Sequence, residues 1–305
     1  MWFDGANGEG PNGRRQAYDW PRIHATVRRL QPDAVMFSDA GPDLRWIGDE
    51  KGVAGETCWS SIDPASVPYP GYDRPWVGDL LGHGDPHGSA WRPGESDVSI
   101  RPGWFWHPEE NDKVRSPDGL MELYFSTVGR NSKLLLNVPP NRGGLFDPED
   151  IASLQGFAAK RTAWLAGNLL QGGRVRAGSS DLAHPASGVL DANPDTYWGA
   201  KRNMRNAWLE IELPHEIEFD TLELGEAIAL GQNIANYRVE TWNGSVWQPL
   251  TWGTTIGYKK LTRFDPVRTG RLRVLLEFAY DTPRLTRVAA YRGPDRRYGP
   301  GHDEK

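Results

Sequence analysis

Short apolar runs alternate with helical patterns from the start of the chain to about residue 168. Four runs have the length of buried strands, and these are residues 34–38, 57–62, 97–101 and 133–138. Three segments carry apolar residues at helical spacing, and these are residues 18–30, with Asp19 as a candidate cap, 117–129 and 147–168. Short apolar strands that alternate with helices are typical of a parallel α/β sheet.

Residues of types that often take part in catalysis or ligand binding follow these strands. They are Asp4, Asp39, Trp59, Arg101 and Asn137. In a (β/α) barrel the active site is built at the carboxyl ends of the strands, so this order predicts such a domain. Four strands and the end of a fifth at residues 2–3 amount to half of a (β/α)8-type barrel. Residues 40–56 and the stretch up to about residue 95 are predicted as loops.

From about residue 174 the hydrophobic period changes to two. Leu209, Ile211 and Leu213 alternate with charged residues, and residues 237–241 and 272–278 repeat the pattern. Asn243-Gly244 has the composition of a hairpin turn. Many such strands predict an antiparallel β-sandwich of the jelly-roll type. The sequence thus divides into a partial barrel (1–170), a sandwich (174–292) and a polar tail (293–305).

Composition excludes several classes of function. A net charge of −5 without a basic stripe argues against a nucleic-acid partner and against an acidic membrane surface. The single cysteine, Cys58, cannot form an internal disulfide. The first residues show no basic segment followed by an apolar run, so we expect a cytoplasmic location for the chain as written.

Tryptophan is the informative excess, with 14 residues. Six of them lie in loops rich in glycine and proline, and these are Trp46, Trp59, Trp76, Trp91, Trp104 and Trp106. Indole rings stack on the apolar faces of sugars while the ring N–H reaches a hydroxyl group. This distribution favours a carbohydrate ligand, although each single tryptophan could equally be part of a core.

Four segments together resemble glycoside hydrolase family 29, the α-L-fucosidases, in its α-1,3/1,4-type subgroup. They are Trp2-Phe3-Asp4-Gly5-Ala6-Asn7-Gly8-Glu9-Gly10, residues 37–50 (FSDAGPDLRWIGDE), residues 101–107 (RPGWFWH) and residues 136–140 (LNVPP). The resemblance covers about residues 1–168 and lacks the amino-terminal half of the family's barrel. It implies a retaining enzyme for terminal α-linked fucose on glycans, in a family whose members are often secreted or periplasmic.

The resemblance also implies the site residues. Asp4 is the expected nucleophile and Glu50 the expected acid/base, with Glu56 as the second candidate. A retaining glycosidase needs two such carboxyl groups about 5–5.5 Å apart. Asp49 stands where we expect asparagine in the family. The expected substrate-binding residues are Trp2, Arg45, Trp59, Trp104 and His107, each of which could instead be structural.

A second resemblance covers about residues 174–292. Residues 188–198 (GVLDANPDTYW) are similar to the signature loop of discoidin-like (F5/8 type C) domains. Asp191, Asn193 and Asp195 resemble calcium-binding loops of such modules, so a structural calcium is conceivable, although the closing strand lacks the acidic residue often found there. No catalytic cofactor is expected. His83 and His87 lack a third ligand at a set spacing, so no metal site is predicted.

These observations leave three hypotheses open. The first is a retaining α-L-fucosidase, with transfucosylation as a second outcome, in which homo-oligomerisation closes the half-barrel. The second is a non-catalytic carbohydrate-binding protein with a vestigial barrel. The third is a general interaction sandwich. Unpaired edges of a parallel sheet attract further strands, which is why we expect a homo-oligomer.

Overall fold

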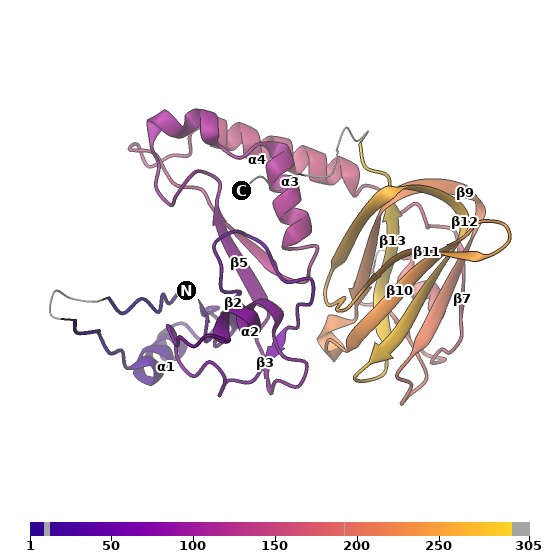
Figure 1. The fold of residues 1–305 in the computed structure, drawn as a ribbon, viewed down its shortest axis with the longest axis horizontal. Helices are drawn as coiled ribbons and strands as arrows, with labels where there is room; N and C mark the ends of the chain where they lie inside the picture. The colour runs from indigo at the N-terminus through magenta and orange to yellow at the C-terminus, as the bar shows by residue number, and fades with distance from the viewer. Residues whose placement is uncertain (9–12, 192, 295–305) are drawn as a thin grey trace.

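The computed structural model describes residues 1–8, 13–191 and 193–294 (Figure 1). Most of the predicted tail, residues 295–305, lies outside the described residues, as do Glu9 and Gly10 of the first motif. Among the described residues, no helix has the length and apolar character needed to cross a membrane.

A four-stranded parallel sheet organises the first part of the chain, in the order β1-β2-β5-β6. Its strands are β1 (Phe37–Ser38), β2 (Leu44–Trp46), β5 (Gly94–Ser99) and β6 (Lys133–Asn137). Trp2 adds a parallel bridge to Phe37 beyond β1. A separate antiparallel pair is formed by β3 (Ser61–Ile62) and β4 (Ala90–Trp91). The parallel α/β prediction is therefore confirmed.

The helices of this part are α1 (Trp20–Leu30), α2 (Val77–His83), α3 (Pro117–Ser126) and α4 (Pro148–Trp164), with a 3-10 turn, η1, at Pro108–Lys113. Helix α1 begins after Asp19, whose carboxylate accepts a hydrogen bond from the backbone N–H of Arg22 and caps the helix as predicted. Leu120 and Leu123 of α3 pack with Val98 and Ile100 at the end of β5. Apolar packing therefore holds the helix against the sheet.

Two sequence predictions in this part were wrong. Residues 57–62 do not form the second parallel strand, because Ser61–Ile62 pairs antiparallel with β4. The second parallel strand is instead Leu44–Trp46, and α2 lies in the second predicted loop. This strand has only three residues, with an arginine at its centre, so it shows no hydrophobic period. Glycines and acidic residues surround it, which is why the sequence predicted a loop there.

Seven antiparallel strands form the second part, seen in orange and yellow in Figure 1. They are β7 (Arg174–Ala177), β8 (Trp198–Gly199), β9 (Ala207–Glu226), β10 (Ile234–Trp242), β11 (Trp247–Gly253), β12 (Lys260–Ala279) and β13 (Arg284–Tyr291), with 3-10 turns η2 (Ala186–Val189) and η3 (Ile228–Leu230). The two long strands, β9 and β12, pair along most of their length. β10 pairs with the later part of β12, and β11 pairs with β10. β7 pairs with the earlier part of β9, β13 pairs with its later part, and β8 pairs with β13.

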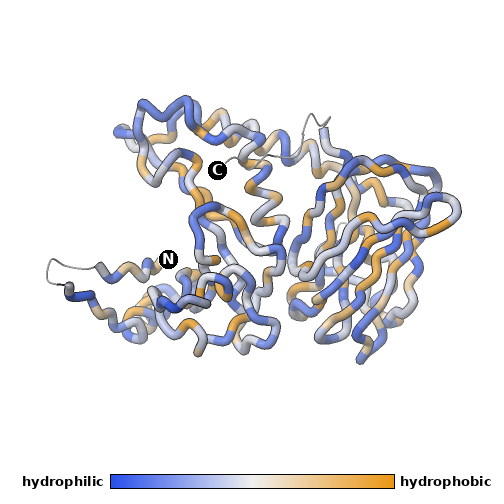
Figure 2. The backbone as a smooth tube through the Cα atoms, viewed as in Figure 1, coloured by the Kyte–Doolittle hydropathy of each residue, from blue (hydrophilic) through white to orange (hydrophobic). Residues whose placement is uncertain are grey.

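One hydrophobic core lies inside this folded sheet. Leu209, Val274, Leu222 and Val288 belong to it, and so do residues from every strand that was predicted by its period of two. Hydrophobic and hydrophilic residues alternate along these strands in Figure 2. The strand assignment from the sequence is thus confirmed.

Buried hydrogen bonds join the two parts. The Asn131 amide donates to the carbonyl of Cys58 (3.0 Å) and to the side chain of Gln232 (3.2 Å), and its oxygen accepts from the backbone N–H of Tyr258 (2.7 Å). The Gln232 amide also donates to the Cys58 carbonyl (2.9 Å). Because all these groups are buried or half-buried, any loss of alignment would leave polar atoms without partners.

A buried carboxyl group, Glu226, orders the loops at this junction. Its oxygens accept hydrogen bonds from the backbone N–H groups of Asn233, Ile234 and Gly257. Burial nevertheless raises the pKa of Glu226 from 4.5 to about 7, against the effect of these bonds.

Glu226 predicts a pH dependence of stability. The folded protein holds the proton more tightly than the unfolded chain, so this contribution is complete below pH 4.5 and is lost as the pH rises to about 7. Between pH 5 and pH 8 it amounts to about 2–3 kcal/mol in the free energy of unfolding. In urea denaturation, the free energy of unfolding should change less between these two pH values in Glu226→Gln than in the parent protein. Equal pH dependence in the two proteins would contradict this assignment.

Candidate active site

The carboxyl ends of the parallel strands gather the candidate catalytic groups. Asp4 follows the bridge at Trp2, Asp39 follows β1, and Glu50 lies four residues after β2. Trp104 follows β5, and Asn137 ends β6. Since neighbouring parallel strands present the same ends to one edge, these residues from distant parts of the sequence share that edge.

Asp4 is solvent-exposed, and its Oδ1 accepts a hydrogen bond from the backbone N–H of Ala6 at 2.8 Å. Gly5 packs so closely on Gly71 that an added Cβ would lie 2.1 Å from the Gly71 nitrogen. Gly71 in turn donates to Asp39 at 2.9 Å. Burial is the main cause that raises the pKa of Asp39, and the charge of Asp4 adds to it. One edge therefore holds an exposed carboxylate beside a carboxyl group that resists ionisation.

Glu50 lines a hollow of about 190 Å³ together with Ser99, Arg101, Trp104 and Arg115. The indole N–H of Trp104 donates to Glu50 Oε2 at 3.3 Å, and the Asn137 amide donates to the Trp104 carbonyl at 3.1 Å. Asn137 thus helps to hold Trp104, and the Trp104 ring lies beside the exposed carboxyl group of Glu50. This is an arrangement that can hold a sugar and a proton donor together.

Asp97, in the middle of β5, is a half-buried neighbour of this hollow that the sequence did not single out. Its carboxylate accepts a hydrogen bond from the indole N–H of Trp46 at 2.5 Å. Burial raises the pKa of Asp97, and the charges of Glu50 and Asp49 raise it further. Its position inside an apolar strand was the available signal, because an acidic residue there needs a partner.

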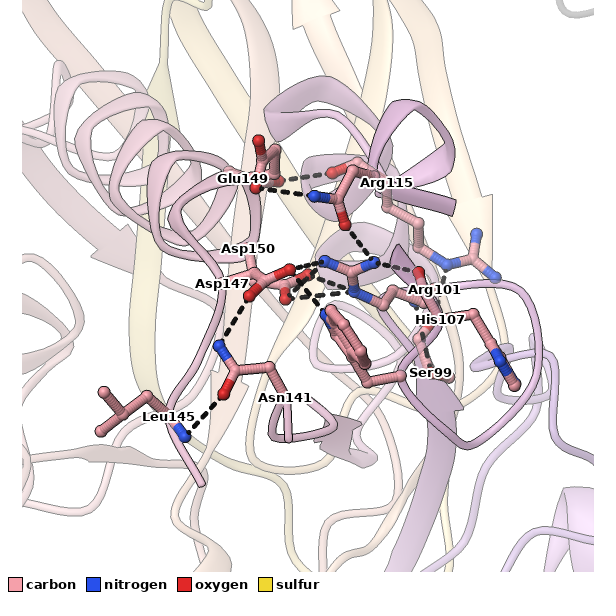
Figure 3. Close-up of polar contacts among 12 residues, drawn as sticks. Ser99, Arg101, His107, Arg115, Asn141, Leu145, Asp147, Glu149 and Asp150 are labelled. Atoms are coloured by element: carbon pink, nitrogen blue, oxygen red, sulfur yellow. Dashed lines mark hydrogen bonds and ion pairs between the residues drawn. The ribbon is translucent and has the colours of Figure 1, made fainter. Parts of the chain in front are cut away.

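Arg101 supports the floor of the hollow (Figure 3). Its Nε and Nη2 atoms donate to both carboxylate oxygens of Asp150 at 3.0–3.1 Å, and both side chains are fully buried. Its Nη1 donates to Asn111 at 2.9 Å and to the His107 carbonyl at 3.3 Å. The bidentate ion pair therefore fixes the segment after β5 on which Trp104 stands.

The other acid/base candidate, Glu56, lies in a different setting. Its side chain is 70% exposed and forms ion pairs with Arg130 at 2.5 Å and Lys260 at 3.2 Å. Glu56 does not belong to the residues that line the hollow with Glu50 and Trp104. Its contacts join the parallel-sheet part to the second part of the chain.

Two predicted substrate-binding residues are in structural positions. Arg45 is fully buried, and its three nitrogens donate to the carbonyls of Leu81, Arg92 and Trp59 at 2.9 Å each. All three nitrogens of Arg45 are therefore engaged with backbone carbonyls, which favours the structural alternative for this residue. The Trp59 ring is 5% exposed and meets the ring of Tyr280 at 5.5 Å between centroids, so Trp59 packs against the second part.

Trp2 and His107 remain accessible. Trp2 is 43% exposed and its ring lies 4.3 Å from that of Phe37, so one strand end presents an aromatic surface two residues before Asp4. His107 is exposed at the start of η1, and its carbonyl accepts from Arg101. Glu50 and Trp104 are therefore in direct contact. Asp4 and Trp2 lie at the same edge of the sheet, beyond β1.

The described residues contain no group of three or more His, Cys, Asp or Glu side chains that could hold a metal ion. In the predicted calcium loop, the Asp191 carboxylate accepts from the hydroxyl of Thr196 at 2.6 Å and from the backbone of Asn193 at 3.0 Å. Arg287 donates to the Asp191 carbonyl at 3.1 Å. The positively charged guanidinium of Arg287 therefore lies beside this loop. A structural calcium ion stays a prediction.

The known proteins that this chain is similar to include α-L-fucosidases. The sequence is 36% identical to α-L-fucosidase 1 of Arabidopsis thaliana over 304 residues, which is 95% of this chain and 57% of the relative. The crystal structure of SpGH29 matches with a TM-score of 0.87 and 34% identity, over 96% of this chain and 63% of that one. A GH29 fucosidase of Ruminococcus gnavus, solved in complex with fucose, matches with a TM-score of 0.84 and 28% identity, over 96% and 60%.

The chain is similar to α-L-fucosidases over almost its whole length. Residues 174–281 match the F5/8 type C domain, in agreement with the resemblance of residues 188–198. The chain spans little more than half the length of its curated fucosidase relative.

The pair of Arg101 and Asp150 should be a main determinant of stability. Arg101→Met leaves a buried carboxylate without its counter-charge, which should lower the free energy of unfolding by about 3–5 kcal/mol. The double variant Arg101→Met/Asp150→Leu should regain much of that loss, because the fully buried carboxylate is removed and Asp147 keeps its hydrogen bonds from Trp106 and Asn141. Urea denaturation at pH 7 measures both. A single variant as stable as the parent protein would show that the pair is dispensable.

Proposed function

We propose that the protein acts as a retaining α-L-fucosidase on terminal α-linked fucose of glycans. The observation that carries the proposal is the similarity to α-L-fucosidases over 95% of the chain, together with two carboxyl groups, Asp4 and Glu50, at the carboxyl edge of the sheet. In this proposal Asp4 is the nucleophile and Glu50 is the acid/base.

The reaction proceeds in two displacements. Asp4 attacks C1 of fucose while Glu50 protonates the glycosidic oxygen, so that the aglycone leaves and a fucosyl-Asp4 ester forms. Glu50, now a carboxylate, removes a proton from water as water attacks C1, which releases fucose and restores Asp4. If a sugar hydroxyl replaces water in the second step, the product is a transferred fucose.

The surroundings of the two residues suit these roles. Asp4 is exposed and next to Gly5 and Ala6, which leaves room for a sugar ring. Glu50 is next to the Trp104 ring, and the charges of Asp49 and Asp97 lie close to its carboxyl group. In this scheme Trp2 and Trp104 flank the sugar and His107 donates to a hydroxyl.

The four parallel strands, in this proposal, form half of a (β/α)8-type barrel within a domain of residues 1–170, and the sandwich spans residues 174–292. Further strands then pair along the open edge of β6 and beyond Trp2. They come either from additional sequence of the same polypeptide or from a second copy of this chain. A homo-oligomer is the second case, and it makes the activity per molecule fall on dilution, whereas the first case does not.

The alternative is a carbohydrate-binding protein without catalysis. The aromatic residues at the sheet edge favour it as much as they favour an enzyme, since Trp104 and Trp2 can bind a sugar in either case. Only the enzyme requires the Asp4 carboxylate, so this residue separates the two hypotheses.

Hydrolysis of an aryl α-L-fucoside tests the proposed function. We expect turnover by the parent protein and a loss of at least about 1000-fold in Asp4→Gly, because the covalent step has no nucleophile. Binding of fucose, measured by calorimetry, should persist in the variant. Turnover that survives in Asp4→Gly, or a folded parent protein that binds fucose without hydrolysing it, would contradict the proposal.

Substrates with different leaving groups decide between the two glutamates. Glu50→Ala should lower kcat about 100- to 10,000-fold for a poor leaving group, which needs the general acid, and far less for a nitrophenolate. It should also abolish the alkaline limb of the pH profile. Glu56→Ala serves as the matched control and should keep that limb. The reverse pattern would assign the acid/base role to Glu56.

A further inference from the structure

The loop that carries Glu50, residues 47–57, is held by contacts on both sides. Gly52 packs on Val98 and Leu123, where an added Cβ would lie 2.8–3.0 Å from their side chains. The backbone N–H of Ala54 donates to the Ser126 carbonyl at 2.9 Å. These contacts attach the middle of the loop to β5 and α3.

The end of the loop is held by the F5/8 type C domain. The Lys260 ammonium donates to the Glu56 carbonyl at 3.0 Å and to its carboxylate at 3.2 Å. Lys260 is 6% exposed and starts β12, inside the stretch that matches the F5/8 type C domain. A buried ammonium that donates to both the backbone and the side chain of one residue restricts that residue more than a surface ion pair does.

Arg130 extends this contact back along the loop. It pairs with Glu56 at 2.5 Å and donates to the Ala54 carbonyl at 2.9 Å. Lys260, Glu56 and Arg130 thus form one chain of contacts that ends on the loop four residues after Glu50. We call it the Lys260–Glu56–Arg130 network.

The residues that follow the loop are bound to the same domain. The hydroxyls of Thr57 and Thr254 lie 2.8 Å apart, and Cys58 N–H donates to Thr255 at 2.8 Å. Ser60 N–H donates to Gln232 at 2.8 Å. The sandwich therefore fixes residues 56–60 as a continuous segment, which a module joined by a flexible linker does not do.

We propose that the F5/8 type C domain positions the acid/base loop, and that Lys260 is a positioning residue for Glu50. The inference rests on the proposed role of Glu50. It gives the domain a part in catalysis through the Lys260–Glu56–Arg130 network, whether or not the domain also binds glycan. Loss of the ammonium frees Glu56 and Arg130, and Glu50 then samples positions from which it cannot protonate the leaving oxygen.

Hydrogen–deuterium exchange of residues 47–57 tests this in three variants of the protein. Lys260→Met removes the ammonium, Lys260→Arg keeps a cation, and Lys259→Met is the matched control, since its side chain pairs with Glu223 inside the sandwich at 3.3 Å. Exchange in the loop should rise about 10-fold in Lys260→Met, stay at the parent level in Lys259→Met and be partly restored in Lys260→Arg. An unchanged loop in Lys260→Met, or an equal rise in Lys259→Met, overturns the proposal.

Kinetics on an aryl α-L-fucoside gives a second readout. Lys260→Met should lower kcat about 5- to 10-fold for a poor leaving group and leave KM within about 2-fold, because substrate binding does not need the acid. For a nitrophenolate leaving group, kcat should hardly change. An equal loss for both leaving groups would mark Lys260 as merely structural. If the parent protein shows no turnover, the proposed function fails, while the exchange experiment still decides whether Lys260 holds the loop.

Discussion

Parallel pairing of four strands, two of them very short, is the constraint on which the candidate site depends. Strands β1 and β2 have two and three residues, and their hydrogen bonds alone bring Asp4, Asp39 and the Glu50 loop to one edge. So few backbone contacts cannot hold such a sheet without help. The buried Arg45 supplies part of it, since its three hydrogen bonds join β2 to the carbonyls of three other segments.

The sandwich supplies another part. Gln232 and Lys260 of the sandwich, with Asn131 of the first part, donate hydrogen bonds to backbone carbonyls of residues 56–58 in place of water. These bonds hold the two parts of the chain against each other. The same contacts that stabilise the junction also fix the end of the Glu50 loop. Stability and the proposed catalysis therefore share residues, and the F5/8 type C domain supports the proposed site beside it.

The sequence was sufficient for the elements with a clear period. Residues 133–137 and 148–164 were predicted with small errors at their ends, because burial on one face leaves a pattern. Within the long strands β9 and β12, only residues 209–213 and 272–278 were predicted. The sequence was insufficient for β2, because three residues centred on Arg45 are too few to show a hydrophobic period. It also could not show that Glu56 meets Lys260 across 204 positions, nor that Arg45 is buried. Asp4 and Glu50 came from the resemblance to a family, and Asp97 was missed because its meaning depends on its neighbours in space.

The most direct test of the account is to trap the covalent intermediate. A 2-deoxy-2-fluoro-fucosyl fluoride slows both displacements, and its good leaving group allows the first step to proceed, so the ester accumulates on the nucleophile. Peptide mass spectrometry after proteolysis should find one fluorofucosyl group, on the peptide that contains Asp4, and none in Asp4→Gly. A label on another carboxylate, or no label on a folded protein that hydrolyses aryl fucosides, would contradict the assignment of Asp4 as the nucleophile.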